Sequence, residues 1–223
     1  MQVSGGDRPP LQHSPLEHVF AGAASVPFAF AEQFLHGKHL PYGMRLDGVM
    51  HRIWHRPRLL TPLFWLLGKL GILVPFQAQD VPTTLVVTPG HNERDGLYHV
   101  WDRTLEFDPP IRFRTTIIYD NKLDKVVDLV GPGDRLYMVW DGQFHEPDRF
   151  TLDTHSIALR LFGREWWLPK PIWKFFFGTV VFSQVASAEN PAEVKIDLLI
   201  KHPLFGRIFG YEGTFRVVRL EPA

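Results

Sequence analysis

Residues 192–218 read AEVKIDLLIKHPLFGRIFGYEGTFRVV, and this stretch decides the fold. Apolar and polar side chains alternate at its start and again at its end, which is the period-two pattern of half-buried strands. Pro203 and Gly206 lie between the two alternating segments and are typical of a turn. The pattern predicts two antiparallel strands joined by a tight connection.

The same pattern extends back to about Leu85, with turn signals between short runs rich in Val, Ile, Thr, Phe, Tyr and Trp. Evenly spaced turn signals favour a meander of eight to ten antiparallel strands that forms a barrel-like or strongly curved sheet. The turns are expected at Pro89-Gly90, Asp108-Pro109-Pro110, Asp120-Asn121, Gly131 to Asp134, Pro147-Asp148, Gly163, Gly178, Asn190-Pro191 and Pro203 to Gly210.

The N-terminal third contains the predicted helices. The segment after Pro27 is expected to be a short helix that stops near Gly37, and Leu59 to Leu73 has an apolar period close to that of a helix. Between them, Met44 to Trp54 alternates as a first strand. The fold class is therefore mainly β, or α+β by count, with two or three short helices in the N-terminal third.

Composition limits the domain organisation and the partners. Residues 1–15 have the composition of a flexible tail, which leaves 16–223 as a single β-rich domain. The 24 basic residues balance the 24 acidic ones, so the charge does not favour nucleic acid. No secretory signal and no transmembrane segment is visible, which favours a cytoplasmic location, and a chain without cysteine has neither disulfides nor thiolate chemistry.

Several tracts carry a family resemblance. Trp101-Asp-Arg103, the sequence His202-Pro-Leu-Phe-Gly206, and Gly210-Tyr-Glu-Gly213 with Thr-Phe215 resemble a bacterial family called domain of unknown function 4166 (DUF4166). The resemblance covers roughly residues 28–218. Members of that family occur alone or fused to saccharopine-dehydrogenase-like reductases, so it implies a possible reductase partner. It implies no catalytic residue, and Leu105 departs from the usual Trp-x-Arg-x-Phe pattern.

The most interesting pair for binding is Trp101 and Arg103, which share one face of a predicted strand. Inside a barrel, the guanidinium would bind a carboxylate or phosphate while the indole packs against an apolar tail. The structural alternative is an arginine paired with an acidic neighbour, since Arg112 and Arg114 make a cationic stripe on the next strand.

Other polar groups favour structural roles. Asp153 and His155 share a strand face without a nucleophile, and His51 and His55 lack an acidic third ligand, so we expect no metal site and no cofactor. His202 and Tyr211 are expected to form hydrogen bonds over the loop shaped by Pro203 and the following glycines.

Aromatic residues supply the remaining candidates. Trp140 lies on a predicted inner face, and Trp166, Trp167, Trp173 and Phe175 to Phe177 are too densely spaced for all of them to be core. The ligand-binding candidates are thus Trp101, Arg103, Arg112, Trp140, Trp166, Trp167 and Tyr211.

The leading hypothesis for function is a β-barrel that binds an apolar or amphipathic small molecule. The first alternative is an isomerase- or cyclase-like enzyme for a hydrophobic intermediate, with Arg103 as anion anchor and a barrel His or Asp as base. The second is an interaction module for a reductase partner, with the Trp166 to Phe177 cluster as its contact surface.

Overall fold

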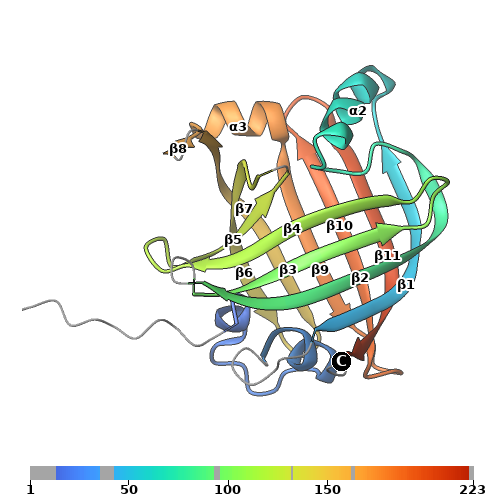
Figure 1. Cartoon of the computed structure of the whole chain (residues 1–223), viewed down its shortest axis with the longest axis vertical. Helices are drawn as coiled ribbons and strands as arrows, with labels where there is room; N and C mark the ends of the chain where they lie inside the picture. Colours follow the sequence, from blue (N-terminus) through green and yellow to red (C-terminus); the bar gives the residue numbers. More distant parts are fainter. Residues whose placement is uncertain (1–13, 36–42, 93–95, 132, 162–163, 221–223) are drawn as a thin grey trace, which may run out of the picture.

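A computed structural model describes residues 14–35, 43–92, 96–131, 133–161 and 164–220. Ten strands close into an antiparallel barrel, in the order β6-β5-β4-β3-β2-β1-β11-β10-β9-β7, with β7 pairing back onto β6 (Figure 1). The strands of the ring are β1 (Met44–His55), β2 (Ala78–Asn92), β3 (Gly96–Leu105), β4 (Ile111–Asp120), β5 (Lys125–Val130), β6 (Leu136–His145), β7 (Arg149–Leu161), β9 (Thr179–Ala186), β10 (Glu193–His202) and β11 (Gly206–Arg219).

The predicted fold class is confirmed. The stretch that opened the sequence analysis forms β10 and β11, which pair from Glu193↔Arg216 to His202↔Gly206. The predicted first strand is β1, and it closes the barrel by pairing with β11 on one side and β2 on the other. An eleventh strand, β8 (Arg164–Trp167), pairs only with the end of β7 and lies outside the ring.

Gly48 marks the closure of the barrel between β1 and β11. It pairs with Phe215, and a Cβ atom at Gly48 would lie 2.1 Å from the carbonyl oxygen of Thr214. The two strands therefore approach so closely that only a glycine fits at this position.

Helices cover the two ends of the barrel (Figure 1). At one end lie the short helices η1 (Glu17–Phe20), α1 (Phe28–Phe30) and η2 (Ala31–Leu35), and at the other lie η3 (Arg58–Leu60), α2 (Thr61–Lys69) and α3 (Lys170–Phe177). The helix predicted after Pro27 is thus confirmed, and the one predicted over Leu59 to Leu73 is shorter than expected. Helix α3 lies in the last third of the chain, where no helix was expected.

Aromatic rings fill the barrel at the N-terminal helices. Phe20, Phe30 and Phe34 pack against Phe144 and Phe150 of the barrel wall, with ring centroids 5.1–6.4 Å apart. We call these five residues the aromatic plug. Because they are fully or nearly buried apart from Phe144, this end of the barrel is closed by side chains.

The turn expected at Pro89-Gly90 is wrong, because both residues lie within β2 and pair with His99 and Tyr98 of β3. The isolated turn signal was overridden by pairing along the long β2–β3 hairpin. Of the predicted tail, residues 1–13 lie outside the described residues, and so does the helix stop at Gly37, while Ser14 is buried beside Leu16.

Candidate functional site: a polar cluster in an apolar barrel cavity

The barrel encloses a cavity of about 130 Å³ at the end covered by α2 and α3. At that end it is lined by Leu67 of α2, by Phe177 of α3 and by Leu73, which follows α2 in the chain. Strand residues line the rest of the cavity. The inner faces of β6, β9 and β10 supply Leu136, Met138, Trp140, Val180, Phe182, Leu198 and Ile200, and Trp140 was predicted to face inward. Alternation along these strands sends every second side chain inward, so the wall is almost entirely apolar.

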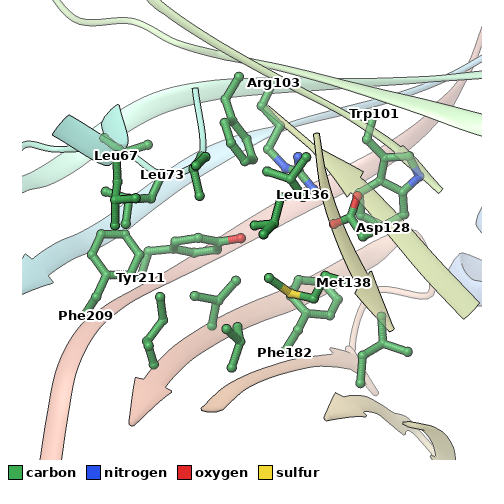
Figure 2. A pocket seen from close by; sticks show the side chains of 18 of the residues that line it. Leu67, Leu73, Trp101, Arg103, Asp128, Leu136, Met138, Phe182, Phe209 and Tyr211 are labelled. Carbon is green, nitrogen blue, oxygen red and sulfur yellow. The ribbon is translucent and has the colours of Figure 1, made fainter. Parts of the chain in front are cut away.

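Three charged or titratable side chains interrupt this apolar wall: Arg103 from β3, Asp128 from β5 and Tyr211 from β11. Each occupies an inward position of its strand, and Asp128 lies between the inward residues Val126 and Val130. Figure 2 shows the guanidinium, the carboxylate and the phenol hydroxyl all pointing toward the same central region. We call these three residues the polar cluster.

Arg103 has few partners for a guanidinium inside a protein. Its Nη1 donates one long hydrogen bond of 3.4 Å to the Thr115 hydroxyl. Its Cζ lies 5.2 Å from the ring centroids of both Trp101 and Phe113, which places the cation against two aromatic faces. A guanidinium carries five N–H donors, so most of the donor capacity of Arg103 is unused within the described part of the chain.

Asp128 is a buried carboxylate without a close cation. Burial raises its pKa to about 6, and this effect outweighs the lowering by Arg103 and by a hydrogen bond from Thr115. Within the described residues, its Oδ1 has no hydrogen-bond partner and it forms no ion pair with Arg103. The guanidinium of Arg103 and the carboxylate of Asp128 therefore attract each other but do not form an ion pair.

Tyr211 adds a neutral donor to the cluster. Burial raises the pKa of its phenol, with a lowering contribution from Arg103 and a raising one from Asp128. The hydroxyl therefore remains protonated near neutral pH and can donate a hydrogen bond into the cavity. Below about pH 6, where Asp128 is protonated as well, the cavity offers donors of three kinds to one polar group.

Four of the seven ligand-binding candidates from the sequence line this cavity: Trp101, Arg103, Trp140 and Tyr211. The other three do not. Arg112 is exposed, because it occupies an outward position on β4 next to the partly buried Phe113. Trp166 and Trp167 are 59% and 45% exposed on β8, outside the closed ring, where Trp167 packs edge-on against Tyr137 at 5.8 Å.

The remaining polar pairs have structural settings. His155 lies on the outer surface and pairs with Asp141 at 2.9 Å instead of with Asp153. His51 is exposed, with its ring nitrogens 3.4 Å from Asp80 and 3.1 Å from Thr214. No group of three or more metal-ligating side chains occurs among the residues that the structure describes.

His202 holds a loop in place. Its Nε2 donates to the Phe175 carbonyl at 2.7 Å, and its Nδ1 accepts from the Leu204 backbone at 3.1 Å. The prediction that His202 forms hydrogen bonds over the loop backbone is confirmed, whereas the same prediction for Tyr211 is wrong, because this side chain lines the barrel cavity. These contacts also join the β10–β11 turn to α3, a link between distant segments that the sequence did not indicate.

Sequence reasoning missed Asp128 and its neighbour Thr115. The signal was present in Val126-x-Asp128-x-Val130, which places an acidic residue in the inward register of a strand. It was not used, because the partners of Asp128 come from β3, β4 and β11 and their proximity depends on barrel closure.

Comparisons with known proteins name a family and no activity. A search of curated proteins finds no match. Among solved structures, a chain from Thermobifida fusca YX provisionally named a thioesterase II shares 10% identity, covering 86% of this chain and 82% of that one, with a TM-score of 0.26. That similarity is too low to support an argument about function. The family model for a domain of unknown function, DUF4166, matches residues 31–215, and the protein belongs to this family.

Proposed function

We propose that the barrel binds a compact amphipathic small molecule whose acidic head group is held by Arg103. The observation that carries this proposal is the polar cluster, in which a guanidinium with unused donors faces an otherwise apolar cavity. Carboxylates match a guanidinium in geometry and form its strongest hydrogen bonds. Trp101, Phe182 and Met138 would then pack against the apolar part of the ligand.

The cavity volume limits the size of this ligand. A dry cavity of about 150 Å³ accepts one benzene ring, and the cavity here measures about 130 Å³. A short acid such as hexanoate or benzoate therefore suits the enclosed space. A longer tail would extend past Leu67 and Phe177 toward the α2 and α3 end, since the aromatic plug blocks the opposite direction.

Calorimetric titration with hexanoate and with 1-hexanol tests the proposal. The two probes share a tail and differ in charge. Losing a hydrogen bond to a charged group costs about 1.5–3 kcal/mol, so Arg103→Gln is expected to weaken hexanoate binding roughly ten- to hundredfold and to leave hexanol binding unchanged. Arg112→Gln, on the exposed face of the neighbouring strand, is the matched control. Equal hexanoate affinity in both variants, or no binding by the wild type, overturns the proposal.

The raised pKa of Asp128 supports a second candidate function, an isomerase-like enzyme. A buried carboxylate with a pKa of about 6 is suited to accept a proton near neutral pH. The carboxylate would remove a proton beside a ligand carbonyl, while Tyr211 and Arg103 stabilise the resulting enolate oxygen. Arg103 and the Asp128 base both line the cavity, as this mechanism requires, whereas His155 lies on the outer surface and bonds to Asp141.

Deuterium exchange distinguishes the enzyme from the binding protein. Cyclohexanone has a size that suits the cavity, and NMR in D₂O measures exchange of its α-protons. Wild-type protein is expected to accelerate the exchange, Asp128→Asn to abolish the acceleration, and Arg112→Gln to retain it. If the wild type gives no acceleration while hexanoate still binds, the barrel is a binding protein without this activity.

A further inference from the structure

The exposed apolar side chains of this protein gather at one end of the barrel. Large hydrophobic residues with exposed side chains are concentrated in three segments of the described chain, residues 59–76, 166–176 and 204–205. The segments contain α2 and the residues beside it, β8 with α3, and the β10–β11 turn. Figure 1 places α2, α3 and β8 at the same end, opposite the N-terminal helices. We call this surface the apolar rim.

Helix α2 has the wrong composition for an ordinary surface helix. It buries Phe64 against His55 and Phe209, as a core-facing residue should. However, Trp65 and Leu66 on its outer side are 51% and 50% exposed. A surface helix normally presents polar side chains to water, and one that is apolar on all sides requires another apolar environment.

Helix α3 and the β10–β11 turn extend the same surface. Phe176 is 61% exposed and Leu204 is 68% exposed. The two segments are held together by His202, which bonds to the Phe175 carbonyl and to the Leu204 backbone and lies between the rings of Phe175 and Phe205. The exposed rings therefore belong to a fixed surface instead of separate loops.

Charge provides the second, independent observation. The chain has equal numbers of basic and acidic residues, but residues 56–79, 166–182 and 198–211 contain basic residues and no acidic one. The basic residues are Arg56, Arg58, Lys69, Lys170, Lys174, Lys201 and Arg207, and all except Lys174 are exposed. Lys69 lies 4.0 Å from the centroid of the exposed Trp65 ring, so cation and indole occur side by side.

We propose that the apolar rim docks on an anionic lipid bilayer. Leu, Phe and Trp side chains surrounded by Lys and Arg are the composition of segments that lie in a membrane interface, where the apolar side chains enter the acyl boundary and the cations contact anionic head groups. No helix in the described ranges is long enough and apolar enough to cross a membrane. The contact is therefore peripheral, with α2 and α3 lying on the surface.

This docking would place the covered end of the cavity at the lipid surface, because Leu67 of α2 and Phe177 of α3 line the cavity from beneath the rim. An amphipathic ligand would then exchange between bilayer and barrel without crossing water. The docking itself depends only on the composition of the rim and holds whether or not the cavity binds a ligand. A lipid surface suits the rim better than a protein groove, since its three segments carry seven cations, which outnumber the acidic residues nearest to them, Glu165 on β8 and Asp197 near Arg207, and so favour a uniformly anionic partner.

Vesicle co-sedimentation of the full chain tests the proposal. The probes are vesicles of phosphatidylcholine alone and of phosphatidylcholine mixed with phosphatidylserine. Binding is expected only to the anionic vesicles and is expected to weaken as salt is added. Each basic residue near an anionic surface contributes about fivefold in affinity, so Lys170→Gln combined with Lys201→Gln is expected to weaken binding roughly thirtyfold.

The apolar contribution is tested separately with Trp65→Ser and Phe176→Ser, which are expected to reduce binding without changing the melting temperature, since both side chains are more than half exposed. The matched controls lie away from the rim: Phe28→Ser, whose ring is 54% exposed at the opposite end, and Lys195→Gln on β10. Controls that reduce binding as much as the rim variants overturn the proposal, as does equal binding to neutral vesicles.

A protein occupant of the rim gives a different result. If light scattering on protein without vesicles shows a dimer that Phe176→Ser dissociates, the rim is an interface between two copies of this chain and the lipid proposal is overturned. A monomer that binds no vesicle of either composition has the same consequence. Hexanoate titration measured on the same preparations shows whether the cavity functions independently of the rim.

Discussion

Replacing Asp128 by asparagine removes a buried charge and nearly preserves the shape of the side chain. Burial raises the pKa of Asp128 from 3.8 to about 6 in the folded protein. The folded state therefore binds the proton more tightly than the unfolded chain, and wild-type stability falls as pH rises through this interval. Two pKa units correspond to about 3 kcal/mol, which is the cost of keeping the carboxylate ionised above about pH 6.

Asp128→Asn removes this cost only where the carboxylate is ionised. The advantage of the variant over the wild type in free energy of unfolding is expected to grow by about 3 kcal/mol between about pH 4 and pH 7. Urea unfolding followed by tryptophan fluorescence at a series of pH values measures it. Asp153→Asn, on the outer face of β7, is the control and is expected to show no such growth. A constant difference between Asp128→Asn and wild type across this range refutes the assignment of Asp128 as a buried, poorly paired carboxylate.

Three further predictions concern neighbouring parts of the barrel. His99 is 5% exposed, and burial lowers its pKa to about 4, so its contribution to stability is present above about pH 6.5 and is lost as pH falls toward 4. At acidic pH, the free energy of unfolding of His99→Gln, measured with urea, is therefore expected to exceed that of wild type by up to about 3 kcal/mol. An equal loss of stability in acid by both proteins contradicts this. Gly48→Ala brings a methyl group against the Thr214 carbonyl and is expected to destabilise by about 1–3 kcal/mol, measured as a lower urea midpoint; a change within error argues against the close approach of β1 and β11. A bound hexanoate places a second negative charge beside Asp128, so hexanoate affinity is expected to fall as pH rises through about 6. In Asp128→Asn the affinity is expected to stay constant over this range. Identical pH profiles for the two proteins would show that the carboxylate of Asp128 does not lie beside the bound acid.

Asp128 and His99 act in opposite directions over nearly the same pH range. Asp128 favours the folded state as pH falls from about 6, and His99 disfavours it as pH falls from its ordinary pKa of 6.5. The wild-type stability is therefore expected to vary less with pH between 4 and 6.5 than either single variant does. The opposing effects are separated only by comparing both variants with wild type.

The barrel was predictable from the sequence because it depends on local patterns. Alternation in residues 192–218 specifies two strands and their inward faces, and β10 and β11 have those faces in the structure. Trp101 and Arg103 were placed inside the barrel for the same reason, because residues two apart on one strand share a face. The error at Pro89-Gly90 arose where a local turn signal lies within a long paired strand.

The aromatic cluster shows where local patterns stop being sufficient. Density alone indicated that Trp166 to Phe177 exceeds what a core needs, and most of these side chains are exposed. The segment nevertheless divides into β8 and helix α3, and Trp173 is fully buried while Phe176 is exposed. Which ring faces water depends on how α3 packs against the barrel end, which involves β7 and β10.

By itself, the sequence determined the strand pattern, the apolar interior, the shared strand face of Trp101 and Arg103 and the inner-face position of Trp140, since side-chain direction along a strand is a local property. Tertiary structure alone decided that Asp128 lines the same cavity as Arg103 and Tyr211, and that α2, α3 and the β10–β11 turn share one end. These groups lie far apart in the chain and come together only when β1 pairs with β11 and β6 with β7. Barrel closure is a property of the whole chain, and no window of sequence contains it.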